Sequence, residues 1–219
     1  MSVFMESSFE LAFGTFDLFE DAMRRFIPAL GAEGWRLIGA FRNTTGNVSM
    51  ATHLWELPDF DSLAAAAERA VSANPELLDD VGKLGDIIRA ERISLLTPLA
   101  HDPSVTGEKP DPAAPVFQRV SFDLEFGSLE RFNAAMHHVI PALTAQGWRL
   151  LGTFRNTTGD VYDAMNLWAL PNLDAMRTAG PRARAANPEL AEEAGKLAKI
   201  IRTETVELLV PLAHHPPER

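Results

Sequence analysis

The chain has 219 residues, enough for one or two domains, and its 46% hydrophobic and 23% charged residues are ordinary proportions for a globular protein. Thirty acidic against twenty basic residues give a net charge of −10, so we expect neither nucleic acid nor a membrane as a partner. There is no cysteine, which excludes disulfides and thiolate chemistry. The chain starts without a basic leader, and it has no apolar run of about 18 residues, which predicts a cytoplasmic location.

The sequence contains an internal duplication. Residues 34–37 recur at 147–150, an offset of 113, and this register continues without a gap from residues 3–101 onto residues 116–214. About 54 of the 99 aligned pairs are identical, and repeats of this length are whole domains. We therefore predict a first domain at residues 1–101, a Pro-rich linker at residues 102–115 and a second domain at residues 116–219.

Each repeat is expected to begin with a strand and a helix. Phe9, Leu11 and Phe13 alternate with small or polar residues, which indicates a strand with one apolar face. After Gly14 the apolar residues recur at helical spacing, with Thr15 as the expected N-cap. The second repeat carries the same pattern 113 residues later.

A hairpin, two helices and a strand should follow. Residues 35–42 alternate, the Asn-Thr-Thr-Gly run at 43–46 suits a tight turn, and a second strand is expected at about residues 48–57. Pro58-Asp59 and Asn74-Pro75 each open a helix, and Ile93–Leu99 should form the closing strand. The expected order is β-α-β-β-α-α-β.

This order predicts an α+β protein of two ferredoxin-like βαββαβ repeats. Such a repeat folds as an antiparallel four-stranded sheet with helices on one face, and its other face needs a cover. We expect the two sheets to pack as an intramolecular pseudo-dimeric α/β barrel. Two independent domains are the alternative, and further homodimerisation of the chain is left open.

Several short motifs resemble a known family. The run Gly46-Asn47-Val48 and the run 53–57, His-Leu-Trp-Glu-Leu, followed by a helix, are similar to the NIPSNAP family of the dimeric α/β-barrel superfamily. Gly34 and Gly39 on the preceding strand fit the same pattern. The resemblance covers nearly all of both repeats and implies a binding or accessory protein. The superfamily also implies cofactor-free oxygenases, isomerases, lactone-forming enzymes and haem proteins.

The chain departs from that pattern in two places. The second repeat has Asn166 where the first has His53. The arginines that the family carries early in the following helix are absent, since residues 61–64 read Asp-Ser-Leu-Ala. Any role that the family gives those arginines is in doubt for this chain.

The candidate catalytic residues are a histidine and two arginines. His53 shares strand parity with Trp55 and is a candidate general base, because its pKa lies near neutrality. Arg42 and Arg155 are candidate stabilisers of an anion or enolate. The competing interpretation is a hydrogen-bonded core histidine, with arginines in ion pairs that hold the halves in register.

The remaining candidates would bind a substrate. Trp55 and Trp168 would form aromatic walls, and Asn166 keeps the geometry of His53 without its base. Gly180-Pro181 is expected to interrupt a helix in the second repeat and open a gap. The substrate-binding candidates are Trp55, Trp168, Asn166, Tyr162, Asp163, Arg36 and Arg149.

The sequence thus predicts a small-molecule-binding protein, with the small molecule as its partner. Its enzymatic form would be a cofactor-independent oxygenase, cyclase or isomerase that acts on an apolar or aromatic metabolite in a biosynthetic pathway. We expect no cofactor and no metal, because phosphate loops, dinucleotide fingerprints and His-Glu-x-x-His spacings are missing. The rival interpretations are a non-catalytic scaffold and haem binding through His137 or His138.

Overall fold

The computed structural model describes residues 3–106 and 114–216. Packing divides them into two compact units. The first unit contains residues 3–96 and 210–216, and the second contains residues 97–106 and 114–209. None of the helices in these described stretches is long and apolar enough to span a membrane.

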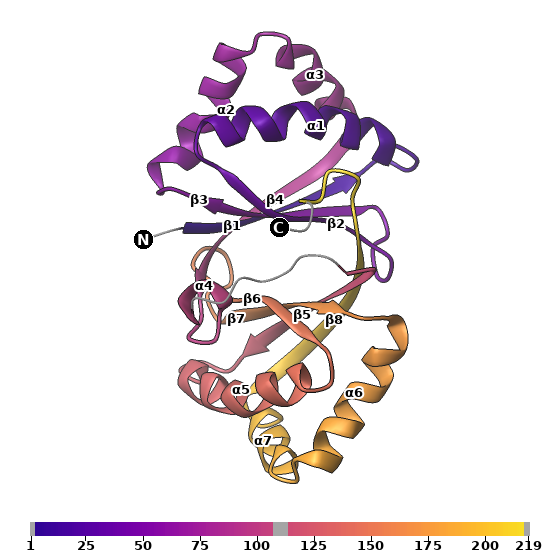
Figure 1. Ribbon diagram of the computed structural model, residues 1–219. Helices are drawn as coiled ribbons and strands as arrows, with labels where there is room; N and C mark the ends of the chain where they lie inside the picture. The colour runs from indigo at the N-terminus through magenta and orange to yellow at the C-terminus, as the bar shows by residue number, and fades with distance from the viewer. Residues whose placement is uncertain (1–2, 107–113, 217–219) are drawn as a thin grey trace. The chain divides into compact units, whose positions relative to one another are not determined.

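The first unit is an antiparallel sheet with three helices on one face (Figure 1). Its strands pair in the order β2-β3-β1-β4, with Ala40 opposite His53 and His53 opposite Ser7. The elements in chain order are β1 (Val3–Leu11), α1 (Phe16–Ala32), β2 (Arg36–Asn43), β3 (Met50–Leu57), α2 (Asp61–Ala73), α3 (Leu77–Ile87) and β4 (Ile88–Pro98).

The second unit repeats this architecture. Its strands pair in the order β6-β7-β5-β8, and three helices cover one face of the sheet (Figure 1). A short helix, α4 (Pro103–Thr106), precedes them. The other elements are β5 (Val116–Leu124), α5 (Leu129–Thr144), β6 (Arg149–Asn156), β7 (Asp163–Leu170), α6 (Leu173–Ala186), α7 (Leu190–Leu197) and β8 (Ile201–Pro211).

The predicted βαββαβ order and α+β class are confirmed in both units. The hairpin turns lie where the Asn-Thr-Thr-Gly runs place them, and Gly46 and Gly159 close them at φ of 69° and 75°, a region that favours glycine. Two details differ from expectation. β4 begins at Ile88, five residues before the predicted Ile93, because residues 88–92 continue the pairing with β1. Pro181 lies inside α6 and does not interrupt it.

The compact units do not coincide with the sequence repeats. Residues that follow β8 pack in the first unit, where Leu212 is buried and its N–H donates to the carbonyl of Ala40 at 3.0 Å. Residues that follow β4 pack in the second unit, where the N–H of Leu99 donates to the carbonyl of Thr153 at 2.9 Å. Each sheet is thus completed by a segment from the other repeat. The repeat boundaries at residues 101 and 116 stay a sequence prediction.

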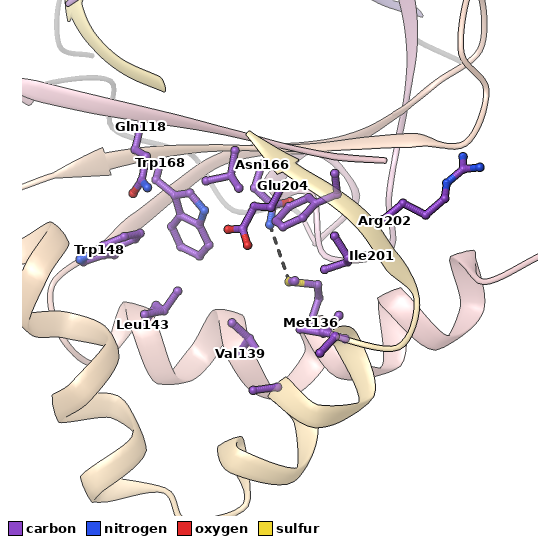
Figure 2. Close-up of a pocket in the computed structure, with 15 residues that line it drawn as sticks. Gln118, Met136, Val139, Leu143, Trp148, Asn166, Trp168, Ile201, Arg202 and Glu204 are labelled. Atoms are coloured by element: carbon purple, nitrogen blue, oxygen red, sulfur yellow. Dashed lines mark hydrogen bonds between the residues drawn. The ribbon is translucent and has the colours of Figure 1, made fainter. Parts of the chain in front are cut away.

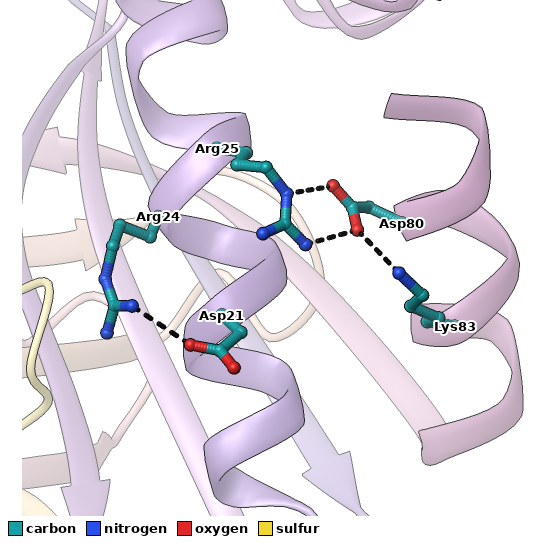
Figure 3. A network of polar contacts seen from close by, with 5 residues as sticks. All are labelled: Asp21, Arg24, Arg25, Asp80 and Lys83. Carbon is teal, nitrogen blue, oxygen red and sulfur yellow. Dashed lines mark hydrogen bonds and ion pairs between the residues drawn. The ribbon is translucent and has the colours of Figure 1, made fainter. Parts of the chain in front are cut away.

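An ion pair ties two helices of the first unit together (Figure 3). Arg25 on α1 donates two hydrogen bonds of 2.5 Å to the carboxylate of Asp80 on α3, and Lys83 approaches the same carboxylate at 3.5 Å. Asp80 is buried, and the hydrogen bonds from Arg25 lower the pKa of its carboxyl below the usual value. A two-pronged contact of this kind fixes the spacing of α1 and α3.

The exchanged leucines should matter to stability. We expect Leu212→Ala and Leu99→Ala each to lower the free energy of unfolding by about 2–4 kcal/mol, because each removes a buried side chain and leaves a cavity. Urea denaturation of the full chain measures this. Leu78→Ala is the control, since Leu78 is exposed and should change stability by less than about 0.5 kcal/mol. Equal, small changes in the free energy of unfolding at all three positions would contradict the packing of Leu212 and Leu99 into the opposite units.

Candidate functional site

The second unit contains a cavity of about 580 Å³ between its helices and its sheet (Figure 2). Strands β5, β7 and β8 provide one wall, and helices α5 and α7 provide the other. The volume suits a small organic molecule, and the lining is largely apolar. The cavity therefore lies on the helix-covered face of the sheet. The sequence alone did not indicate which face would have it.

The strand wall follows from register and parity. Gln118 pairs with Trp168, and Val120 pairs with Asn166, so all four side chains point to the same face of the sheet. Phe122 continues this face along β5. Trp168 and Trp148 meet edge to face, with ring centroids 5.6 Å apart and planes at 70°. These indoles form an aromatic corner of the cavity.

The helix wall is built at helical spacing. Met136, Val139 and Leu143 on α5 lie three and four residues apart, so they share the face that looks onto the sheet. Ala194 and Leu197 on α7 extend this wall. The side chains are aliphatic or small, and they leave space above the aromatic corner.

Two buried amides provide polarity inside the cavity wall. Asn166 accepts a hydrogen bond of 2.7 Å from the hydroxyl of Thr153. Figure 2 shows its amide nitrogen in contact with the sulfur of Met136, at 3.6 Å. Gln118 is buried, and its Oε1 has no hydrogen-bond donor among the described residues. A buried amide without its full set of partners costs free energy, which a ligand can recover.

The corresponding region of the first unit has a larger side chain packed in it. Val139 corresponds to Phe26, which is buried in one cluster with Phe9, Met23 and Leu84. Two further wall positions are also smaller in the second repeat: Ala194 replaces Val81, and Asn166 replaces His53. At two other wall positions the second repeat has the slightly larger side chain: Val120 replaces Ser7, and Ala198 replaces Gly85. The loss of a phenyl ring from the helix wall is the largest difference.

The helix tie of the first unit is also changed in the second. The position of Arg25 is taken by His138, which is exposed, and that of Asp80 by Glu193, which pairs with Lys196 on its own helix at 2.8 Å. Because that contact stays within α7, it cannot fix α7 to α5. Among its described residues, the second unit thus lacks an ion pair equivalent to Arg25–Asp80.

His53 lies in the first unit, buried at 1% exposure, and is not part of the cavity lining. Its Nε2 is 2.9 Å from Nε2 of His214, which comes from the exchanged segment after β8. Phe9, Phe19 and Trp55 surround the ring, with centroids 5.4, 5.5 and 6.0 Å away. The structure brings His53 and Trp55 together as predicted, within a packed core.

Burial and a second histidine keep this pair neutral. Burial lowers the pKa of His53 well below its usual value, and His214 adds to the effect. Burial also lowers the pKa of His214 to about 4, with further contributions from Arg24 and His215. Both rings are therefore neutral, and one donates its Nε2–H to the unprotonated Nε2 of the other.

The candidate arginines do not line the cavity. Arg36 pairs with Glu56 on the adjacent strand of its own sheet, and Arg42 is exposed with its guanidinium 5.8 Å from the ring centroid of Phe16. Arg149 is half-buried on β6, and Arg155 is exposed at the end of that strand. Their catalytic and binding roles stay predictions.

Asp163 is the first residue of β7 and Tyr162 precedes it, and neither lines the cavity. The ring of Tyr162 contacts exposed Phe126. Asp163 clusters with Asp123 and Asp160, and burial raises the pKa of its carboxyl, with the two neighbouring carboxylates adding to the rise. Of the predicted binding residues, the cavity thus contains Trp168 and Asn166.

The haem candidates also lie away from the cavity. His137 and His138 are exposed on α5, and His137 faces His101, with ring centroids 5.4 Å apart. Neither imidazole is among the side chains that form the cavity wall. The geometry of this cavity therefore gives haem no axial ligand from either residue.

Sequence reasoning missed most of the cavity wall and the His53 partner. The signal for the wall was available in the repeat alignment, where Val139 stands against Phe26 at a core position of a helix. His214 gave no such signal, because its contact with His53 spans 161 residues and depends on the segment exchange.

The histidine pair should make the protein sensitive to acid. The unfolded chain binds protons at histidine with a pKa near 6.5, while folding lowers both values, so stability should fall as the pH drops from about 6.5 towards 4. His53→Asn should make the free energy of unfolding less dependent on pH across this window, as measured by urea denaturation at several pH values. His138→Asn, an exposed change, should leave that dependence as it is. An unaltered slope in His53→Asn would contradict the account.

Comparisons place the fold among known proteins. A protein from Lactobacillus acidophilus described as a "putative monooxygenase" aligns with 100% of this chain and 98% of its own, at 13% identity and a TM-score of 0.68. One of the same description from Fusobacterium nucleatum aligns with 100% and 97%, at 9% identity and a TM-score of 0.67. A protein described as a "putative chlorite dismutase" covers 96% and 95%, at 15% identity and a TM-score of 0.61. These likenesses confirm the predicted α/β-barrel fold class, and at such identities they show the fold alone.

The family assignment comes from sequence. No curated protein matches the chain. The NIPSNAP family model matches residues 6–103, which span the first repeat from β1 through β4. The predicted resemblance to the NIPSNAP family is thus confirmed for the first repeat, and the second repeat is similar to the first in sequence at the offset of 113 residues.

Proposed function

We propose that the protein binds an apolar or aromatic small molecule in the cavity of its second unit. The observation that carries this proposal is the cavity itself, about 580 Å³ with an aromatic corner formed by Trp148 and Trp168. Such a volume, an apolar lining and a few buried polar groups are typical of ligand sites. The first unit, whose equivalent region is filled by Phe26, would then have a structural role.

The enzymatic form of this proposal is a cofactor-independent oxygenase, cyclase or isomerase on a biosynthetic metabolite. Two solved proteins of the same fold, each described as a "putative monooxygenase", support it only by analogy of fold. Among the described residues of the cavity wall, Glu204 is the one acid, and there is no histidine. Acid–base chemistry thus has few groups available there, and binding is the better supported function.

Refilling the cavity should abolish binding. Val139→Phe restores the side chain that the first repeat has at this position, and we expect the affinity for a neutral aromatic probe, 2-naphthol, to fall by about tenfold or more, because the phenyl ring takes the ligand's place. Isothermal titration calorimetry on the full chain measures this affinity.

The control adds the same ring elsewhere. Val161 lies in the β6–β7 turn of the same unit and is exposed, so Val161→Phe should bind 2-naphthol as the unmodified protein does. Absence of 2-naphthol binding in the unmodified protein, or equal affinity in Val139→Phe, would rule the cavity out as its site.

A further inference from the structure

The cavity of the second unit has a charge preference. We infer that it selects apolar amines, with the ammonium group at Glu204 and the apolar body against Trp148 and Trp168, and that it discriminates against carboxylates. This inference rests on the proposed binding function and names the class of ligand. It differs from the sequence prediction, in which arginines would hold an anion.

Glu204 on β8 is an acidic side chain in the cavity wall. This residue pairs with Phe122 across β5 and β8, so its side chain lies on the helix-covered face of the sheet. Figure 2 shows its carboxylate turned into the cavity, near Asn166 and Trp168. Among the described residues, no ion pair or hydrogen bond engages this carboxylate. A negative charge at the mouth of an apolar cavity thus stands without a counterion.

The cationic side chains near the cavity are paired with other carboxylates. Arg202 is the one cationic side chain in the cavity wall, within the part of the chain that the structure describes. Its guanidinium points away from the cavity in Figure 2 and donates two hydrogen bonds to Asp123, the one from Nε being 3.0 Å long. On α7, Lys196 pairs with Glu192 and Glu193 at 3.0 and 2.8 Å. An anionic ligand would therefore meet Glu204 without a free cation to offset the repulsion.

The rest of the cavity wall contains aromatic and amide groups that can interact with a cation. The indoles of Trp148 and Trp168 offer aromatic faces, and tryptophan is the side chain that attracts cations most strongly through its π-system. Gln118 adds an amide oxygen without a donor, a group that an N–H of the ligand can satisfy. Carboxylate, indole and amide oxygen all favour a cation that donates hydrogen bonds.

Together these features describe a ligand with an aryl or alkyl body and a protonated amine. The body would occupy the space between the tryptophan corner and Val139, and the ammonium would lie at the mouth, where it keeps part of its hydration. A charge pair at a half-exposed site is worth little by itself, so selectivity should arise from attraction of the amine and repulsion of the carboxylate together.

Three probes with the same phenylpropyl body test this inference. They are 3-phenylpropylamine, 3-phenylpropan-1-ol and 3-phenylpropanoate, which are cationic, neutral and anionic at pH 7. Calorimetric titration of the full chain at low ionic strength should rank the amine about three- to tenfold tighter than the alcohol, and the carboxylate weakest. An alcohol or carboxylate that binds as tightly as the amine overturns the inference.

A matched pair of variants assigns the effect to Glu204. Glu204→Gln should remove the preference for the amine over the alcohol while the alcohol binds as before. Glu91 occupies the equivalent position in the filled first unit, opposite Phe9, so Glu91→Gln should keep the full preference. A preference that survives Glu204→Gln, or that is lost in Glu91→Gln, overturns the assignment.

The two proposals fail in different ways. If 2-naphthol and the phenylpropyl alcohol bind and Val139→Phe blocks them, but the charge ranking is absent, the amine inference fails and small-molecule binding stands. If no probe binds, both fail.

Discussion

The arrangement of this protein depends on a packing constraint between one helix and one sheet. Helices α1 and α5 lie against their sheets through the same apolar positions, and protein interiors must be filled with side chains or hold something else. Phe26 meets this requirement in the first unit, where it joins a buried aromatic cluster. Val139 does not meet it in the second unit, and the space that it leaves becomes a cavity. The same position of the duplicated fold thus has a packed phenyl ring in the first unit and lines a cavity in the second.

Contacts outside the cavity support the same division of roles. The first unit has two long-range polar contacts: the Arg25–Asp80 pair between α1 and α3, and the neutral contact between His53 and His214. In the second unit His138 and Glu193 replace the ion pair, so α7 is not tied to α5 in that way. The polar groups around the cavity, above all Glu204, then decide which ligand charge is accepted.

Much of the fold could be predicted from sequence because its determinants are local or repeated. Alternating residues, the Asn-Thr-Thr-Gly turns and an offset of 113 residues led to two ferredoxin-like halves, which the structure has. The site was harder to predict. Trp168 and Asn166 were correctly placed on one face of a strand, but β3 and β7 are apolar on both faces, so the face with the cavity was open. The arginines were chosen for their chemistry, and the structure shows them exposed, half-buried or paired within a sheet.

The central claim, that the second unit and not the first holds the ligand, is tested most directly by the indole N–H signals of the four tryptophans. Two belong to the first unit, Trp35 and Trp55, and two to the second, Trp148 and Trp168. Nuclear magnetic resonance spectra of the ¹⁵N-labelled full chain, assigned with single Trp→Phe variants, would be recorded during titration with 2-naphthol. We expect saturable shifts of Trp148 and Trp168, with Trp35 and Trp55 unchanged. Shifts confined to Trp35 and Trp55, or no shift at any of the four, would contradict it.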